Sequence, residues 1–219
     1  MNTLTTAPLA PLLQRLFADA EASSARMRQE RANSPADSAA RGAQSGDYLA
    51  FYSRYKDYHL AVSPETGNLM YMLARSMAAR NAVEFGTSFG ISTLHIAAAL
   101  KDNGGGRVIT TEFEPSKIAH ARENLQAAKL QDLVEIREGD ALQTLVCDLP
   151  QIDLVLLDGA KPLYLKVLAL LEPHLRNGAM IVADNADWCP EYLARVRERA
   201  NGYLSVPFAG DVELTMRTA

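Results

Sequence analysis

Short apolar runs alternate with helix-like segments from Asn81 onwards, and this alternation limits the folds that the chain can adopt. The runs predict strands at 81–85, 107–111, 134–138, 153–157 and 179–183. The segments between and after them predict helices at 92–100, 115–129, 142–145, 164–171 and 191–199. Two more runs, at 203–208 and 212–217, flank the turn Ala209-Gly210-Asp211 and predict a final antiparallel hairpin. Because alternating strands and helices form parallel sheets with helices on both faces, we predict a doubly wound α/β fold with a mostly parallel, seven-stranded sheet.

The N-terminal part follows a different pattern, and we expect a helical arm or lid, 1–60, ahead of a main domain, 61–219. Apolar residues at helical spacing predict an amphipathic helix over about 8–30. Residues 34–46 are rich in serine, alanine and glycine and predict a loop or hinge. The aromatic-rich segment 48–59 is either a helix packed on the domain by its aromatic side or a lid over an aromatic substrate. Ser63-Pro64-Glu65 predicts the start of a helix that runs to about Arg80.

The overall composition argues against several classes of protein. The 219 residues carry a formal net charge of −4, whereas proteins that must bind nucleic acid normally present a basic surface. Cys147 and Cys189 fit no metal-binding spacing, so we expect both to be reduced, as in a cytoplasmic protein. No apolar run approaches the roughly 20 residues that span a bilayer, and the N-terminus lacks the pattern of a signal peptide. We therefore expect a cytoplasmic protein without a membrane or nucleic-acid partner.

Two of the predicted strands end in polar residues that can carry chemistry. Val155-Leu156-Leu157 is followed by Asp158 and, three residues later, by Lys161. Met180-Ile181-Val182-Ala183 is followed by Asp184-Asn185. The ligand crevice of an open α/β sheet lies outside the carboxyl ends of its strands, so these side chains are expected to converge there. Oxygen ligands suit Mg²⁺, Mn²⁺ or Ca²⁺ better than zinc. The alternatives are that Asp158 caps a helix, that Asp184-Asn185 forms a simple turn and that Lys161 is a solvated surface lysine.

A glycine-rich turn and three acidic residues predict a nucleoside site. The turn, Glu84-Phe85-Gly86-Thr87-Ser88-Phe89-Gly90, follows the first strand and lacks the spacing of a dinucleotide cradle or a P-loop. Glu112, just after the second strand, can accept hydrogen bonds from both ribose hydroxyls of an adenosine. Gly139-Asp140-Ala141, after the third strand, is placed to close an adenine pocket. Three acids around one ligand suit a cationic sulfonium or amino group better than phosphate.

Taken in order, these motifs resemble a known family. The series is Glu84-x-Gly86-x-x-x-Gly90-x-Ser92, Glu112, Gly139-Asp140-Ala141, Leu157-Asp158-x-x-Lys161-x-x-Tyr164 and Ala183-Asp184-Asn185. It looks like the cation-dependent class I S-adenosylmethionine O-methyltransferases, which include the catechol and caffeoyl-CoA O-methyltransferases. The resemblance runs from about Ala61 to Asp187 and implies a Rossmann-like fold for 61–219. It also implies S-adenosylmethionine and a divalent cation as cofactors, with Mg²⁺ expected and Mn²⁺ or Ca²⁺ as alternatives.

The resemblance implies a role for each matching residue. The implied cofactor-binding residues are Val62, Glu84, Gly86, Ser88, Ser92, Glu112, Asp140, Ala141 and Asp158. Among these, Glu84 and Ser92 would hold the amino and carboxylate groups of the methionine end, and Glu112 the ribose hydroxyls. Val62 and Ala141 would give backbone contacts to the methionine end and to adenine. The implied metal ligands are Asp158, Asp184 and Asn185. Lys161 is the implied general base, and it forms the catalytic pair with Asp158.

Two departures from the family pattern concern the acceptor. Gly159 and Ala160 replace bulkier residues of some members, which predicts an open substrate wall, and the longer insertion that follows Trp188 in the family is missing. We expect an O-methyltransferase acting on a catechol-like vicinal diol. The alternatives are a tRNA hydroxyuridine O-methyltransferase of the same fold, which the acidic balance argues against, and a non-catalytic binder of an adenosyl ligand. We also expect a homodimer, in which the helix at Leu9 to Arg31 packs across the two-fold axis or over the partner's site.

Overall fold

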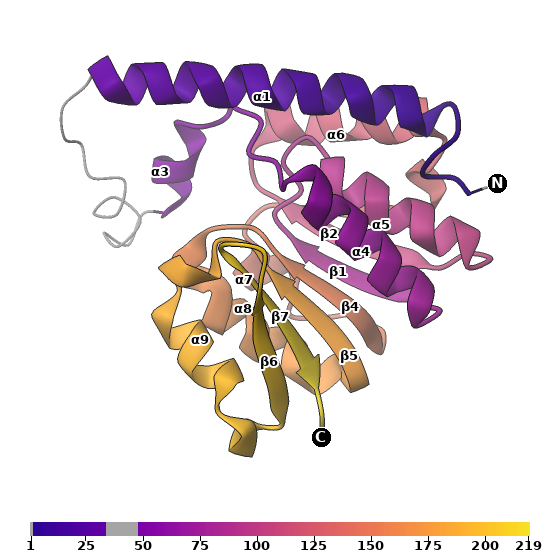
Figure 1. Ribbon diagram of the computed structural model, residues 1–219, viewed down its shortest axis with the longest axis vertical. Coiled ribbons are helices and arrows are strands. Elements are labelled where there is room, and N and C mark those ends of the chain that lie inside the picture. The colour runs from indigo at the N-terminus through magenta and orange to yellow at the C-terminus, as the bar shows by residue number, and fades with distance from the viewer. Residues whose placement is uncertain (1, 34–47) are drawn as a thin grey trace.

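A seven-stranded sheet forms the centre of the computed structural model, which describes residues 2–33 and 48–219 (Figure 1). The strands are β1 (Asn81–Phe85), β2 (Arg107–Glu112), β3 (Val134–Glu138), β4 (Ile152–Leu157), β5 (Leu175–Ala183), β6 (Tyr203–Phe208) and β7 (Val212–Arg217). Their order in the sheet is β3-β2-β1-β4-β5-β7-β6. Strands β1 to β5 run parallel, and β7 runs antiparallel to both β5 and β6. The predicted doubly wound fold with a closing hairpin is therefore confirmed.

The strand order places a crevice beside the two central strands. From β1 the chain continues outwards to β2 and β3, and then returns to place β4 on the other side of β1. Such a reversal leaves a gap at the carboxyl ends of the strands where ligands bind in open α/β sheets. The central strands are apolar because both of their faces are covered: Leu154, Val155, Leu156 and Leu157 are fully buried.

Helices cover both faces of the sheet, as predicted. One face packs against α4 (Pro64–Ser76), α5 (Ile91–Asp102) and α6 (Pro115–Ala128), and the other against α7 (Ala141–Thr144), α8 (Tyr164–Leu171) and α9 (Pro190–Arg197). Helix α4 is shorter than the predicted helix because Met77 caps it and Ala78 takes a left-handed conformation, with φ 51°. Strand β5 begins at Leu175, earlier than predicted, and its pairing with β4 shifts register between Ile152 and Leu154.

The N-terminal helix α1 (Leu9–Asn33) lies along α5 and α6 (Figure 1). Its apolar residues Leu9, Leu12, Leu13 and Leu16 are buried in the same core cluster as α4 and α5. The apolar face on which the dimer prediction rested is thus covered within the chain, and the dimer stays a prediction without that support. Among the residues placed in the structure, no helix is long and apolar enough to cross a membrane.

The aromatic segment forms a shorter helix than expected, α3 (Tyr48–Ser53). Beyond it the backbone continues as turns, in which the N–H groups of Arg54 and Tyr55 bond to carbonyl groups three residues earlier. The ring of Phe51 contacts those of Tyr52 and Tyr55, with centroids 5.1 and 5.6 Å away, and no residue of α3 is fully buried. The loop or hinge predicted over 34–46 lies outside the described residues.

Candidate active site

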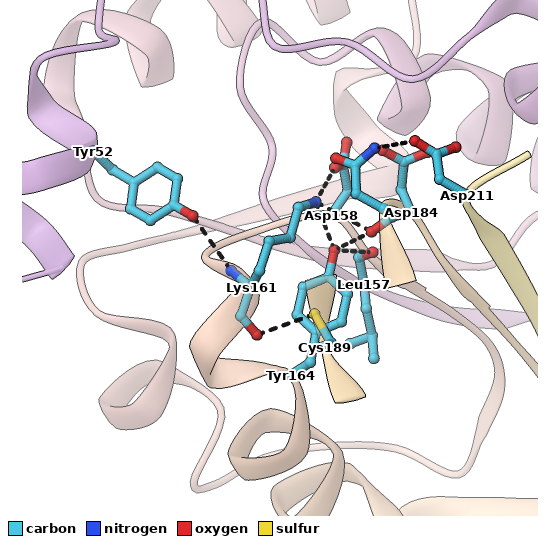
Figure 2. A network of polar contacts seen from close by, with 9 residues as sticks. Tyr52, Leu157, Asp158, Lys161, Tyr164, Asp184, Cys189 and Asp211 are labelled. Atoms are coloured by element: carbon cyan, nitrogen blue, oxygen red, sulfur yellow. Dashed lines mark hydrogen bonds and ion pairs between the residues drawn. The ribbon is translucent and has the colours of Figure 1, made fainter. Parts of the chain in front are cut away.

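Three of the predicted site residues meet at the carboxyl ends of β4 and β5 (Figure 2). The ammonium group of Lys161 donates to Asp158 Oδ1 at 3.1 Å and to the backbone carbonyl of Asp184 at 3.2 Å. The side chains of Lys161 and Asp158 are only 12% and 13% exposed, so this ion pair is well shielded from water. The strand register accounts for the convergence, because Leu157 lies opposite Ala183 and the next residues are Asp158 and Asp184.

The hydroxyl group of Tyr164 contacts this cluster. It lies 2.8 Å from Lys161 Nζ, 2.7 Å from the carbonyl oxygen of Leu157 and 2.8 Å from that of Asp184. A phenol has one proton to donate, so it serves one of these carbonyls and accepts from the lysine. The ring is fully buried and packs edge-on against Tyr192, and burial raises the pKa of Tyr164 well above its usual value. Tyr164 is therefore a core residue, and its hydroxyl also holds the Lys161 ammonium group in place.

The Asp158 and Asp184 carboxyl groups are close enough to share a hydrogen bond, and this proximity shows in the pKa of Asp184. Burial and the charge of Asp158 raise that pKa to about 8, although Lys161 opposes the shift. Two carboxylates in one buried site repel each other unless a proton or a cation lies between them. The residues therefore fit a divalent cation, since two carboxylates and one amide form a set of hard oxygen donors. Among the described residues, no group of three or more His, Cys, Asp or Glu side chains is placed to hold a metal ion. A cation site here would therefore need the Asn185 amide as well as the two carboxylates.

Glu84 lies fully buried at the end of β1 and carries an unpaired oxygen. Its Oε2 accepts from the hydroxyls of Thr93 and Thr110 at 2.5 and 2.6 Å, while Oε1 has no partner. Burial raises the pKa of Glu84 to about 7, against the opposing hydrogen bonds from Ser92, Thr110 and Thr93. A buried acceptor without a donor is costly, so this position fits a ligand that brings an ammonium group. Ser92 lies next to this carboxyl group, and the role of both residues in cofactor binding stays a prediction.

Glu112, at the end of β2, contacts Ser88 in the glycine-rich turn. Glu112 Oε2 accepts from the backbone N–H of Ser88 at 2.9 Å, and Oε1 accepts from the N–H groups of Phe113 and Glu114 at 3.0 Å each. A carboxylate oxygen accepts about two hydrogen bonds, so Oε1 is already satisfied by its two N–H groups, while Oε2 keeps one acceptor site for a ribose hydroxyl. The carboxylate is thus held in a fixed orientation before any ligand binds.

Glycine is required at Gly86 by the protein's own backbone. Its φ is +104°, and a Cβ atom there would lie 2.6 Å from the carbonyl oxygen of Asp158. The turn after β1 therefore touches the end of β4, which brings the predicted cofactor and metal residues together. At Gly159 a Cβ would lie 2.5 Å from the ring of Phe85, so that ring occupies the space expected to be an open wall.

The third predicted contact region begins α7. Asp140 caps this helix by accepting from the N–H of Leu142 at 2.9 Å, and its other oxygen accepts from the hydroxyl of Tyr48 at 2.6 Å. Ala141 is the first, buried residue of α7, and Val62 is buried one residue before the cap of α4, Ser63. The side-chain amide of Asn185, a predicted metal ligand, donates to Asp211 at 2.7 Å.

Sequence reasoning missed several residues at this site. Helix α3 reaches over the crevice: the Tyr52 hydroxyl accepts from the backbone N–H of Lys161 at 3.4 Å, and Ser53 donates to Glu114 at 3.2 Å. Lys117 on α6 is buried, with its ammonium 5.9 Å from the centre of the Phe89 ring. Burial lowers the pKa of Lys117, while the charge of Glu112 opposes the shift. No local pattern marks this lysine as buried, since it lies among other polar residues.

Comparisons with known proteins agree with this arrangement. The sequence family described as a methyltransferase domain matches residues 83–186, which include the turn after β1, Glu112 and the residues that follow β4 and β5. The stretch from β1 to just past the end of β5 is thus similar to a methyltransferase domain. The predicted resemblance to the class I O-methyltransferases is therefore confirmed.

Relatives of this stretch include a catechol O-methyltransferase of Niastella koreensis, 37% identical in an alignment of 134 residues that covers 58% of this chain and 58% of that protein. The chain thus matches little more than half the length of this curated relative. Among solved structures, the cofactor-bound protein Rv0187 from MTB is 27% identical, with a TM-score of 0.67 over 88% of this chain and 95% of that one. The O-methyltransferase TomG of Streptomyces achromogenes, in complex with S-adenosylmethionine, is 27% identical, with a TM-score of 0.67 over 84% and 91%.

Proposed function

We propose that the protein is an S-adenosylmethionine-dependent O-methyltransferase that methylates one hydroxyl of a catechol-like small molecule with the help of a divalent cation. The observation that carries this proposal is the cluster of Asp158, Lys161 and Asp184 beside the crevice. A site that only bound an adenosyl ligand would need neither a lysine that donates to a carboxylate and to a backbone carbonyl nor two neighbouring carboxyl groups. The similarity to a catechol O-methyltransferase supports the acceptor class.

The cofactor is assigned to the crevice beside β1, β2 and β3. Glu84 would receive its amino group through the unpaired Oε1, and Ser92 lies next to that carboxyl. Glu112 would receive the ribose hydroxyls, with Ser88 and Gly86 along the wall. Asp140 and Ala141 would border the adenine, and Val62 the methionine end. Asp158 joins the cofactor and metal positions because its backbone touches Gly86.

The residues of this chain would divide the reaction between them. Asp158, Asp184 and Asn185 would hold a divalent cation, which supplies a positive charge that makes the acceptor's hydroxyls easier to deprotonate. Lys161, in its unprotonated form, would take the proton from the hydroxyl, and the oxygen would then attack the methyl carbon of the sulfonium. An oxygen–carbon bond forms, the carbon–sulfur bond breaks, and its electron pair stays on sulfur as S-adenosylhomocysteine. Fixing the reactants in line can supply up to roughly 7–11 kcal/mol of the barrier.

The decisive experiment is a methyl-transfer screen with catechol, a caffeoyl ester and tRNA, each with Mg²⁺ and with EDTA. We expect methylation of a vicinal diol in Mg²⁺ and none in EDTA, while calorimetry shows S-adenosylmethionine binding in both. Methylation of tRNA alone would favour the hydroxyuridine alternative, and cofactor binding without transfer to any acceptor would favour the non-catalytic binder. Full activity in EDTA would contradict the role of the cation.

Replacing Glu112 with alanine is expected to weaken S-adenosylmethionine binding by about 1.5–3 kcal/mol, because charged hydrogen bonds to the ribose are lost. Glu138 offers a matched control, since it lies opposite Glu112 at the end of β3 and is half exposed in an ion pair with Arg122. Glu138→Ala should leave the dissociation constant nearly unchanged in the same calorimetric measurement. Equal affinities for the wild type and Glu112→Ala would remove Glu112 from the site.

The remaining proposals concern the N-terminal part and assembly. Within the N-terminal part, 1–60, α1 packs into the core of the 61–219 methyltransferase domain. We propose that α3 serves this domain as a lid, because Tyr48, Tyr52 and Ser53 contact residues that follow three different strands. A cytoplasmic location fits the two free cysteines. The homodimer is retained as a proposal, and light scattering at micromolar concentration tests it.

A further inference from the structure

The turn between β6 and β7 reaches the proposed metal ligands from the far end of the sequence. Strand β7 pairs with β5 as far as Glu213 opposite Ala183, which places Asp211 beside the residues that follow β5. Its backbone carbonyl accepts from the N–H of Ala186 at 2.7 Å, and its carboxylate oxygen Oδ2 accepts from Asn185 Nδ2 at 2.7 Å. Figure 2 shows the Asp211 carboxylate in line with those of Asp184 and Asp158.

The hydrogen bond to Asp211 determines which end of the Asn185 amide is available. An asparagine side chain has one end that donates and one that accepts, and only its carbonyl oxygen can bind a cation such as Mg²⁺. An ionised carboxylate has no proton to donate, so the atom of Asn185 beside Asp211 must be the nitrogen. Asn185 is also held by its backbone, which lies in the left-handed region with φ 49° and ψ 42°. Its carbonyl oxygen Oδ1 is therefore not used in the hydrogen bond to Asp211.

We propose that Asp211 is a positioning residue that holds the Asn185 amide with Oδ1 available to the divalent cation. Asp211 acts through Asn185 and does not ligate the cation itself. The inference rests on the proposed function, because it assumes that Asp158, Asp184 and Asn185 form a cation site. Partners that orient metal ligands are commonly worth 10–100-fold in metal affinity.

Mn²⁺ binding, followed by the loss of the electron paramagnetic resonance signal of the free ion, tests this without using activity. Asp211→Ala should weaken Mn²⁺ binding about 10–100-fold. Asp211→Asn should bind Mn²⁺ with an affinity between those of the wild type and Asp211→Ala, since its amide oxygen can still accept from Asn185 but its amide nitrogen can instead donate to Oδ1. Asp187→Ala is the matched control, because it removes an exposed acid from the same loop. It should stay within about threefold of the wild type.

A double-mutant cycle with Asn185→Asp separates orientation from direct ligation. A carboxylate presents equivalent oxygens and needs no orienting partner, so Asp211→Ala should cause no further loss in the Asn185→Asp background. An equal loss in both backgrounds would mean that Asp211 acts as a ligand or by charge, and the inference would be wrong. Wild-type affinity in Asp211→Ala would also overturn it. If the wild type itself bound no Mn²⁺, the cation site of the proposed function would fail first.

Discussion

Replacing Asp184 with alanine is expected to lower the turnover number for methyl transfer at least about 10³-fold, while the dissociation constant for S-adenosylmethionine changes less than about threefold. The two effects separate because Asp184 follows β5, whereas the proposed cofactor contacts Glu84, Ser92 and Glu112 lie at the ends of β1 and β2 or on α5. Single-turnover kinetics and calorimetry on the same preparation measure both quantities. Asp187→Ala, in the adjacent exposed turn, is the control and should keep both values.

The same variant has an expected effect on stability that distinguishes a cation site from a purely structural acid. In the folded chain without a cation, burial and Asp158 raise the pKa of Asp184 to about 8, above the value of about 3.9 for an unfolded aspartate. The charged form is thus disfavoured by folding, and stability is lost as the pH rises from about 4 to about 8. Asp184→Ala should therefore not lower the melting temperature at pH 8 in EDTA. A large drop in melting temperature, together with full activity, would mean that Asp184 only supports the fold.

The sheet and its polar strand ends could be predicted because their signals are local. A buried parallel strand needs a continuous apolar run, and the run ending at Leu157 is one. Because the strand ends at Leu157, Asp158 is the first residue beyond it, and Lys161 follows three residues later. Asp158 and Lys161 can be expected near Asp184 once β4 and β5 are taken as neighbours, and the strand order shows that they are.

The contacts that complete the site could not be predicted because they join residues far apart in the chain. The hydrogen bond from Tyr48 to Asp140 spans 92 positions, and that between Tyr52 and Lys161 spans 109. A tyrosine side chain can pack and donate a hydrogen bond in many settings. The aromatic composition of residues 48–59 therefore does not predict which residue each tyrosine contacts. The amphipathic pattern of α1 likewise predicted an apolar face but not that α5 and α6 would cover it.

At Gly86 the structure gives a reason for glycine that lies within the chain itself. A glycine after the first strand predicted close approach to a ligand. The structure shows that the first atoms a Cβ would meet belong to the backbone of Asp158 and Gly159. That distinction depends on the spacing of β1 and β4, which no local pattern contains. The turn after β1 and the proposed metal ligand Asp158 therefore approach each other closely through their backbones.

Replacing Lys161 with alanine is expected to lower the turnover number about 10²–10⁴-fold and to change the KM for the acceptor much less, because a general base acts in the transition state. Lys161→Arg separates the base from the charge. It keeps a positive group near Asp158 and the carbonyl of Asp184, but a guanidinium stays protonated and cannot take a proton. We therefore expect Lys161→Arg to be nearly as slow as Lys161→Ala. Lys166→Ala, on the exposed side of α8, is the control and should keep wild-type kinetics.

The acidity of the acceptor gives an independent measure of the same role. A nitrocatechol ionises more readily than catechol, so its methylation needs less help from a base. The ratio of wild-type to Lys161→Ala turnover should consequently be smaller for the nitrocatechol than for catechol. Melting temperatures exclude a folding defect, which matters here because the ammonium group also bonds to the Tyr164 hydroxyl. If Lys161→Arg kept wild-type turnover, or if the ratio were the same for both acceptors, Lys161 would act by its charge and position, and proton removal would have to be assigned to another group.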